Sequence, residues 1–381
     1  MNASENASPG RKGLMRLGSH PFIAVVLLFV PAVCSVIHAN SFADRLYDPV
    51  SDAVAPLLQA VEGWSPFWSA LFGGNYGLVA MLPFLLLYAL PTVLLFSVIL
   101  SLYKSSGLTH HISYVLHPYL KYVGINGDDL VRVVMGFGCN VPAVVSSRAC
   151  DQCGRGACIS AISFGAACSY QLPATFAVFA AADCPQMGLV YLILIAVTTL
   201  IYLRFTTPKH VRAVQKLKNS QPSVTSVSMP QWRDSLKDAL GELQQFAMTA
   251  VPIFVAICFI TGLLEWCGVL AYITSALTPL MALFNLPGEA VTAVVLGSIR
   301  KDGIAVGLLN QEAGVLSVAL ETPIQVLTAV YLAGVFLPCI VTLVTIIREM
   351  RWKFALTLCL RQILWASGFS LCIAWGGSLF I

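Results

Sequence analysis

The chain has 381 residues, of which 57% are hydrophobic and only 10% are charged. A soluble globular protein of this length needs far more charge to cover its surface, so the composition excludes that class. The net charge of +4 gives no sign of a nucleic-acid partner and fits basic loops on the inner side of a lipid bilayer.

The amino-terminal segment reads as a polar, basic tail followed by a first membrane span. Arg11, Lys12 and Arg16 precede the apolar run Pro21–Ala39, which resembles a signal peptide at first sight. The run is long for a signal peptide, and no clear small-residue cleavage site follows it. We therefore predict an uncleaved span with a cytoplasmic amino terminus.

Long runs without Asp, Glu, Lys or Arg predict further helices that cross the bilayer, because a span needs roughly 20 apolar residues. We expect an all-α polytopic membrane protein with about seven to nine transmembrane helices and two repeated, re-entrant segments. The full spans predicted are Pro21–Ala39, Leu78–Tyr103, Ala157–Ala182, Pro185–Leu203, Phe246–Glu265, Pro323–Ile347 and Gln362–Ile381.

Basic loops should lie inside, and the segment Arg204–Glu242 is the longest and most basic of them. Its Ser220–Pro230 stretch has the composition of a flexible linker. The acidic segment Ala43–Glu62 suits the outside. The chain then divides into a cytoplasmic tail (1–20), a first membrane half (21–205), a cytoplasmic linker (206–245) and a second membrane half (246–381).

An internal repeat relates the two halves. Tyr103–Gly136 matches Leu264–Gly297 without a gap at a constant offset of 161 positions. Duplicated apolar units with helix-breaking polar turns are typical of membrane transporters, although an old duplication without present function gives the same pattern. We predict that Met135–Ser147 dips in from the cytoplasmic side and Leu296–Asn310 from outside, as an inverted repeat whose turns meet near the midplane.

The first turn carries groups that could bind an ion. Gly136, Gly138 and Pro142 interrupt the helix, and Cys139 and Asn140 add a soft sulfur and an amide oxygen. A kinked packing element would explain the same residues.

A second break lies within the run Ala157–Ala182, where Cys168, Ser169 and Gln171 precede Pro173. Polar groups at this depth are costly unless they face a cavity or partners. Cys339 follows a proline in another apolar run. Because thiolates favour soft or borderline metals and Mg²⁺ or Ca²⁺ sites need more carboxylates, the three cysteines favour a transition-metal ion. Plain packing is the alternative for each of them.

The second turn places three charged residues beside an apolar helix. Gly297 and Ser298 lead into Arg300, Lys301 and Asp302. The turn is either an interfacial loop with a local ion pair or a gate that opens when an ion or a movement releases Asp302.

Cys150, Cys153 and Cys158 form a third cysteine group, in a loop between the two breaks of the first half. They could seed a metal site or hand off a metal in the cytoplasm, and Cys150 and Cys153 could pair outside; a plain polar loop is equally consistent. We find no phosphate-binding loop, nucleophilic triad or paired-carboxylate site, so no enzyme activity is expected.

These motifs together resemble the membrane domain of the ferrous iron transport protein B family. The resemblance covers roughly Gly77–Leu371 and implies Fe²⁺ uptake across a bacterial inner membrane, with Cys139, Cys168 and Cys339 along the ion path and no permanently bound cofactor. The segments that carry it are Gly136–Ala143 with Arg148, Cys168–Pro173, Gly297–Asp302, and Leu337–Thr342 followed by Arg348-Glu349.

The chain departs from that family at several points. The family has Arg where this chain has Gln171, and an acid expected near Tyr103 is absent, although Glu265 fills the matching place in the second copy. Family members carry an amino-terminal GTP-binding domain, whereas about twenty residues precede the first span here. A separate GTPase or a small cytoplasmic activator is therefore an expected partner, and a homo-oligomer is a further possibility.

The sequence thus predicts a divalent-metal permease, with Fe²⁺ as the first choice of transported ion. Its expected ligands are Cys139, Asn140, Cys168, Ser169 and Cys339. The alternatives are a transporter of a nucleoside or another small organic solute, and a membrane partner protein that transports nothing.

Overall fold

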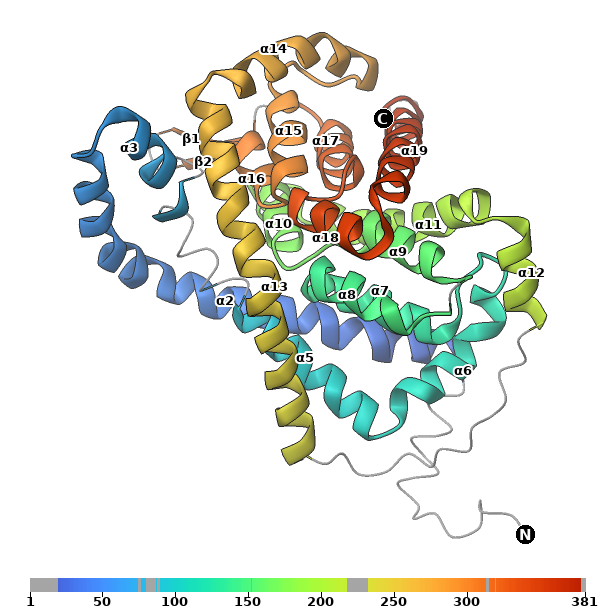
Figure 1. Cartoon of the computed structure of the whole chain (residues 1–381). Helices are drawn as coiled ribbons and strands as arrows, with labels where there is room; N and C mark the ends of the chain where they lie inside the picture. The colour runs from blue at the N-terminus through green and yellow to red at the C-terminus, as the bar shows by residue number, and fades with distance from the viewer. Residues whose placement is uncertain are drawn as a thin grey trace, which may run out of the picture.

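The computed structural model describes residues 20–74, 77–79, 87, 90–151, 153–217, 232–312, 315–318 and 320–377. Figure 1 shows them as a bundle of helices joined by short turns. The predicted all-helical membrane architecture is confirmed. One small addition is the antiparallel hairpin of β1 (Leu309–Glu312) and β2 (Val315–Val318).

The helices of the first half run from α2 to α12. They are α2 (Pro21–Glu62), α3 (Pro66–Gly73), α5 (Leu90–Ser105), α6 (Leu108–Leu120), α7 (Gly127–Gly138), α8 (Asn140–Ser146), the 3₁₀ turn η2 (Ser147–Ala149), α9 (Arg155–Gly165), α10 (Gln171–Ala181), α11 (Met187–Thr206) and α12 (Lys209–Leu217).

The helices of the second half run from α13 to α19. Its helices are α13 (Trp232–Trp266), α14 (Val269–Met281), the 3₁₀ turn η3 (Ala282–Phe284), α15 (Ala290–Ile299), α16 (Gly303–Leu308), α17 (Pro323–Val335), α18 (Ile340–Met350) and α19 (Trp352–Gly377).

The sequence repeat is also a repeat of structure. Helices α6 and α14 have equal length and begin 161 positions apart, each after a glycine with positive φ. Gly107 has φ 77° and Gly268 has φ 70°, a left-handed conformation that glycine adopts without the steric cost of a Cβ. The helices that precede them, α5 and α13, pack along each other (Figure 1).

Both predicted turns break a helix at equivalent residues. Cys139 ends α7 in an extended conformation, with φ −156° and ψ 135°, and Arg300 ends α15 with φ −143° and ψ 140°. The short helices α8 and α16 then pack back against α7 and α15. A Cβ on Gly307 would lie 2.3 Å from the backbone nitrogen of Ala293, so α15 and α16 are in close backbone contact. Each pair has the form expected of a re-entrant hairpin, and the side from which each enters stays a prediction.

Several predicted spans differ from the helices found. The run Ala157–Ala182 is not one helix, because the backbone leaves the helix between Gly165 and Gln171 to give α9 and α10. Helices α17 and α18 are likewise separated at residues 336–339. The polar residues and prolines at these two points free the backbone from helical hydrogen bonding.

Two helices extend beyond their predicted spans. The first span Pro21–Ala39 continues without a break to Glu62, so α2, at about 1.5 Å per residue, is far longer than a ~30 Å hydrocarbon layer. The linker border at residue 245 lies inside α13, whose apolar residues Leu236, Ala239 and Leu243 recur at helical spacing. Residues 1–19, the Ser220–Pro230 stretch and much of the span Leu78–Tyr103 lie outside the described residues.

Within the described ranges three helical segments are long and apolar enough to cross a membrane. They are Met187–Thr206, Pro323–Met350 and Trp352–Gly377, and the bent pair Phe254–Trp266 and Val269–Phe284 gives a fourth if it forms one span. The count of seven to nine spans therefore stays a prediction.

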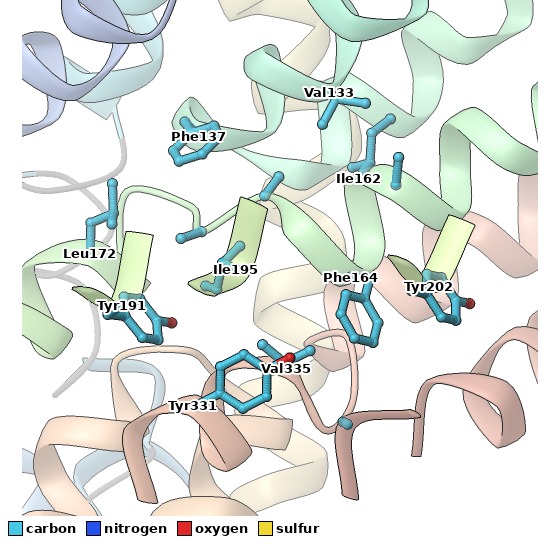
Figure 2. Packing of buried hydrophobic residues seen from close by; sticks show 14 of the residues in the cluster. Val133, Phe137, Ile162, Phe164, Leu172, Tyr191, Ile195, Tyr202, Tyr331 and Val335 are labelled. Atoms are coloured by element: carbon cyan, nitrogen blue, oxygen red, sulfur yellow. The ribbon is translucent and has the colours of Figure 1, made fainter. Parts of the chain in front are cut away.

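The core lies where α7, α9, α11 and α17 meet (Figure 2). Tyr191, Tyr202 and Tyr331 are almost completely buried there, and the ring of Tyr202 stacks on Phe164 at 4.3 Å between centroids. Gln362 of α19 ties this core together, since its amide nitrogen donates to the carbonyls of Ser163 and Val335. The breaks in the helices are thus held by a well-packed frame.

Candidate functional site at the helix breaks

The breaks of both halves line a single pocket. Cys139, Asn140 and Val141 come from the first Gate turn, and Arg300, Lys301 and Asp302 are their equivalents in the second. The remaining lining residues come from the α9–α10 and α17–α18 breaks, from the first turn of α18 and from α13; they are Cys168, Tyr170, Phe254, Cys339, Val341 and Thr342.

Asn140 carries the clearest sign of an incomplete polar site. It is 4% exposed, and its side-chain oxygen has no hydrogen-bond partner among the described residues. This oxygen lies 2.8 Å from the position that a Cβ on Gly136 would take, so glycine is needed to make room for it. A buried amide oxygen without a partner costs free energy unless a ligand or water completes it.

The α9–α10 break is joined to the first Gate turn through its backbone. The amide of Ser169 donates to the carbonyl of Gly138 at 3.2 Å, which places Cys168 beside the pocket. Ser169 itself is buried and does not line the pocket. The predicted breakers Pro142 and Pro173 lie in the first turns of α8 and α10, where a missing N–H is tolerated.

Gln171 lies behind the pocket and not in it. Its amide nitrogen donates to the hydroxyl of Tyr191 at 2.7 Å, and both side chains are buried. The same nitrogen lies 2.6 Å from the position that a Cβ on Gly334 would take. Gln171 thus packs α10 against the end of α17.

Lys301 closes the end of α17. Its ammonium is buried and donates to the carbonyls of Gly334 at 2.8 Å and Leu337 at 2.6 Å, with Ala333 farther away at 3.5 Å. Carbonyls at a helix carboxyl end have no partners within the helix and carry partial negative charge. One lysine therefore both satisfies these groups and is stabilised by them.

Arg300 and Asp302 form the ion pair that the sequence predicts. The guanidinium donates from Nε at 3.1 Å and from Nη2 at 2.6 Å to the two carboxylate oxygens. The guanidinium also lies 5.0 Å from the ring centre of Phe254 and 5.7 Å from that of Tyr170. Ion pairing and ring contacts together hold Arg300 across the pocket.

The other residues of the second turn have structural roles here. Ser298 donates its hydroxyl to the carbonyl of Val294 in its own helix. A Cβ on Gly297 would lie 3.1 Å from the carbonyl oxygen of Ala333, so this glycine lets α15 approach α17.

The three predicted cysteines share the pocket without forming a ready-made metal site. Cys139, Cys168 and Cys339 all line it, and the Cys339 sulfur lies 3.0 Å from the hydroxyl of Thr342. In the part of the chain that the structure describes, their ligand atoms do not come together as a three-ligand group. Sequence reasoning missed Tyr170 and Thr342 as lining residues.

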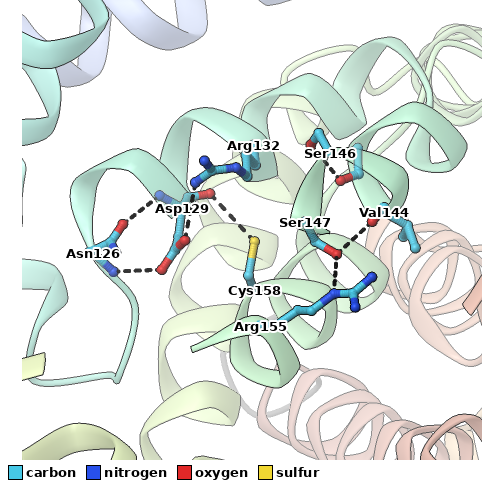
Figure 3. A network of polar contacts seen from close by, with 9 residues as sticks. Asn126, Asp129, Arg132, Val144, Ser146, Ser147, Arg155 and Cys158 are labelled. Atoms are coloured by element: carbon cyan, nitrogen blue, oxygen red, sulfur yellow. Dashed lines mark hydrogen bonds and ion pairs between the residues drawn. The ribbon is translucent and has the colours of Figure 1, made fainter. Parts of the chain in front are cut away.

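A separate ionic network joins η2, the start of α9 and the end of α18. Both Arg148 and Arg155 donate to Oε2 of Glu349 at 2.8 Å. Figure 3 shows Arg155 also donating to the hydroxyl of Ser147, beside the buried residues Asp129 and Cys158. This network fixes the two halves against each other away from the pocket.

Known proteins match most of the chain. A family model described as Gate, nucleoside recognition, matches residues 86–182 and 247–353, which together are more than half of the chain. The Fe(2+) transporter FeoB of Legionella pneumophila is 26% identical over 330 residues, covering 78% of this chain and 42% of the relative. FeoB of Methanocaldococcus jannaschii is 26% identical over 289 residues, covering 68% of this chain and 42% of the relative.

The chain spans less than half the length of these FeoB relatives. A solved structure of a doubly substituted variant of CNTnw in an outward-facing state covers 96% of this chain and 97% of its own, at 12% identity and a TM-score of 0.42. The two repeats and their helix breaks lie within the two ranges that the family model matches. The chain therefore belongs to the Gate family of nucleoside-recognition domains, and it is similar to part of the FeoB transporters.

Proposed function

We propose that this chain is a membrane permease for a divalent transition-metal ion, and that Fe²⁺ is the ion it carries. The ion would pass through the pocket where the two Gate turns meet. Cys139, Cys168 and Cys339 would offer sulfur ligands and Asn140 an amide oxygen. The FeoB relatives are named as Fe(2+) transporters, which supports iron as the substrate.

The observation that carries the proposal is the unpartnered oxygen of Asn140 beside three thiols. Sulfur ligands suit borderline ions such as Fe²⁺ better than Mg²⁺, which prefers oxygen ligands only. Binding would release protons from the thiols that coordinate, because the thiolate is the ligand.

The size of the pocket supports an ion over a larger solute. About 60 Å³ is open to the centres of water molecules, whereas pockets for drug-sized ligands measure roughly 300–1,000 Å³. A metal ion with a water or two fits this space.

The two cations in the pocket make this arrangement a closed one. Arg300 and Lys301 would repel an entering cation. Asp302 holds Arg300 in this position, and the carbonyls at the end of α17 hold Lys301. We infer that Arg300, Lys301 and Asp302 act as a gate, which opens when movement of α15 relative to α17 draws Lys301 away. A partner GTPase or small cytoplasmic activator would speed that movement.

The substrate is tested with purified protein in liposomes. Entry of Fe²⁺, Mg²⁺ and uridine is measured in parallel under reducing conditions, with empty liposomes as control. The proposal requires Fe²⁺ to enter faster than Mg²⁺, with no uridine entry. Uridine entry without iron entry would contradict it.

The second candidate is transport of a nucleoside or another small organic solute. The Arg300 guanidinium between the rings of Tyr170 and Phe254 favours it, since such groups also bind planar organic molecules. In that case Asn140→Ala would reduce solute entry and Cys139→Ser would leave it intact. A membrane partner that transports nothing would show no entry of either substrate.

A further inference from the structure

Outside the Gate pocket, one group of metal-binding side chains comes together. The carboxylate of Asp129 and the sulfurs of Cys150 and Cys158 all lie within 4.8 Å of one another. Asp129 comes from the first turn of α7 and Cys158 from α9, as Figure 3 shows, and Cys150 directly follows η2. The group thus joins three elements that follow one another around the first Gate turn.

Two members of the group are buried, and the carboxylate is already ordered by its neighbours. Asp129 is 1% exposed and Cys158 is fully buried. One oxygen of Asp129 accepts from the backbone of Asn126 at 3.1 Å and the other from Arg132 at 3.3 Å. These contacts fix the carboxylate and leave lone pairs on both oxygens for a metal.

A second observation points to a ligand at the same place. Gln215 of α12 is 1% exposed, and neither atom of its amide has a hydrogen-bond partner in the described ranges. The point where a Cβ on Gly154 would stand lies 3.0 Å from the amide nitrogen of Gln215 and 3.6 Å from an oxygen of Asp129. The buried amide of Gln215 and the carboxylate of Asp129 therefore border the same space beside Gly154, and a half-turn of the amide would bring its oxygen toward an ion there in place of its nitrogen.

The charges suit a divalent ion. Two thiolates and one carboxylate carry three negative charges, and Arg132 supplies one positive charge. A divalent ion brings the sum to zero, which a buried site requires.

We propose that Asp129, Cys150, Cys158 and the amide oxygen of Gln215 bind a thiophilic divalent ion of the Zn²⁺, Co²⁺ or Fe²⁺ class. The site is separate from the Gate pocket, and its existence does not depend on the transport proposal. It would fasten α12 of the linker segment to the first Gate turn. The ion displaces the thiol protons of Cys150 and Cys158 to solvent as two metal–sulfur bonds form.

The required movement is small. With zinc–sulfur bonds of about 2.3 Å, two sulfurs on a tetrahedral ion stand about 3.8 Å apart. The present upper bound of 4.8 Å between ligand atoms is about an ångström longer. Rotation of the partly exposed Cys150 side chain closes such a gap without moving a helix.

The test uses Co²⁺ with the full chain in detergent, kept reduced with a phosphine. Co²⁺ bound by thiolates gives a sulfur-to-cobalt charge-transfer band in the near ultraviolet. We expect this band to rise to a fixed limit, and Zn²⁺ but not Mg²⁺ to remove it. The variant with both Cys150→Ser and Cys158→Ser should lose the band, and Gln215→Leu should keep it with weaker binding.

All these variants are compared in a background in which Cys139, Cys168 and Cys339 are replaced by Ser, so that the Gate cysteines contribute no band, and each protein is checked for folding. Cys184→Ser changes another buried cysteine outside both groups and should keep the full band. Asp129→Asn keeps both thiols and the shape of the carboxylate, and it should weaken Co²⁺ binding in folded protein. A band of equal strength in the double variant would overturn the proposal, as would reduced, folded wild-type protein that gives no band.

Discussion

At the scale of single residues, the two copies of the repeat break their helices at equivalent positions but carry side chains of different chemistry there. Cys139, Asn140 and Val141 stand where the second copy has Arg300, Lys301 and Asp302. One copy offers neutral, soft ligands and the other offers charges that satisfy one another and the end of α17. A pocket built from two copies thus joins a neutral, sulfur-bearing half to a charged half.

Replacing Lys301 with Met tests its structural role. The variant leaves the carbonyls of Gly334 and Leu337 without their donor, so we expect a loss of about 1–3 kcal/mol in the free energy of unfolding. Denaturant-induced unfolding in detergent measures it, with exposed Lys216→Met as the matched control. Equal stability of the two variants would show that Lys301 does not hold α17.

At the scale of helices and turns, the sequence predicted the repeated positions better than the lengths of the elements. The constant offset located the equivalent helices α6 and α14 and both Gate breaks, because glycine and the polar turn residues act locally. The same kind of local signal, Cys168 to Pro173, marked the break that divides Ala157–Ala182, yet the apolar run around it favoured one span. Hydrophobicity alone does not distinguish a continuous helix from two buried short ones.

Contacts between distant segments were not predictable from one sequence. Phe254 reaches the pocket because α13 packs beside α8 and α18, and no residue near it in the chain signals this. The group of Asp129 with Cys150 and Cys158 likewise depends on how α7 packs against α9. A cysteine pattern indicated a possible site, and only the fold supplied its carboxylate.

The glycines before α6 and α14 give a test at this scale. A Cβ on Gly268 would meet nothing within 4 Å, so Gly268→Ala changes only the cost of its positive φ. We expect Gly268→Ala to lower the free energy of unfolding by about 1–2 kcal/mol and Gly268→Asn to lower it less. Equal losses for the two variants would contradict a backbone cause.

Gly136 tests packing in the same way, for a different reason. A Cβ there would lie 2.5 Å from the Cβ of Ala166, so Gly136→Ala must push α7 from the α9–α10 break. We expect lower stability, of about 1–3 kcal/mol, together with loss of transport. Gly241→Ala, where a Cβ meets nothing within 4 Å, is the control. Full stability and transport of Gly136→Ala would show that the break tolerates a wider spacing.

At the scale of the whole molecule, the two halves share one pocket and one frame. Helix α5 of the first half packs against α13 of the second. Glu349 of the second half accepts hydrogen bonds from Arg148 and Arg155 of the first. A transporter built this way can alternate by moving one half against the other about a fixed site. The inverted orientation of the halves is a prediction from loop charge.

That orientation predicts the side on which the linker lies. The basic residues of Arg204–Glu242 place it inside, so a protease should cut within Ser220–Pro230 in inverted membrane vesicles. Intact spheroplasts should be resistant until they are lysed. Cleavage in intact spheroplasts would reverse the topology.

The most direct test of the central claim is Fe²⁺ entry into liposomes that hold Cys139→Ser, measured beside Cys184→Ser. Cys139 lines the Gate pocket, whereas Cys184 is a buried cysteine outside it. The account predicts severe loss of Fe²⁺ entry in folded Cys139→Ser and wild-type entry in Cys184→Ser. Equal Fe²⁺ entry through both variants would contradict a metal path through the Gate pocket.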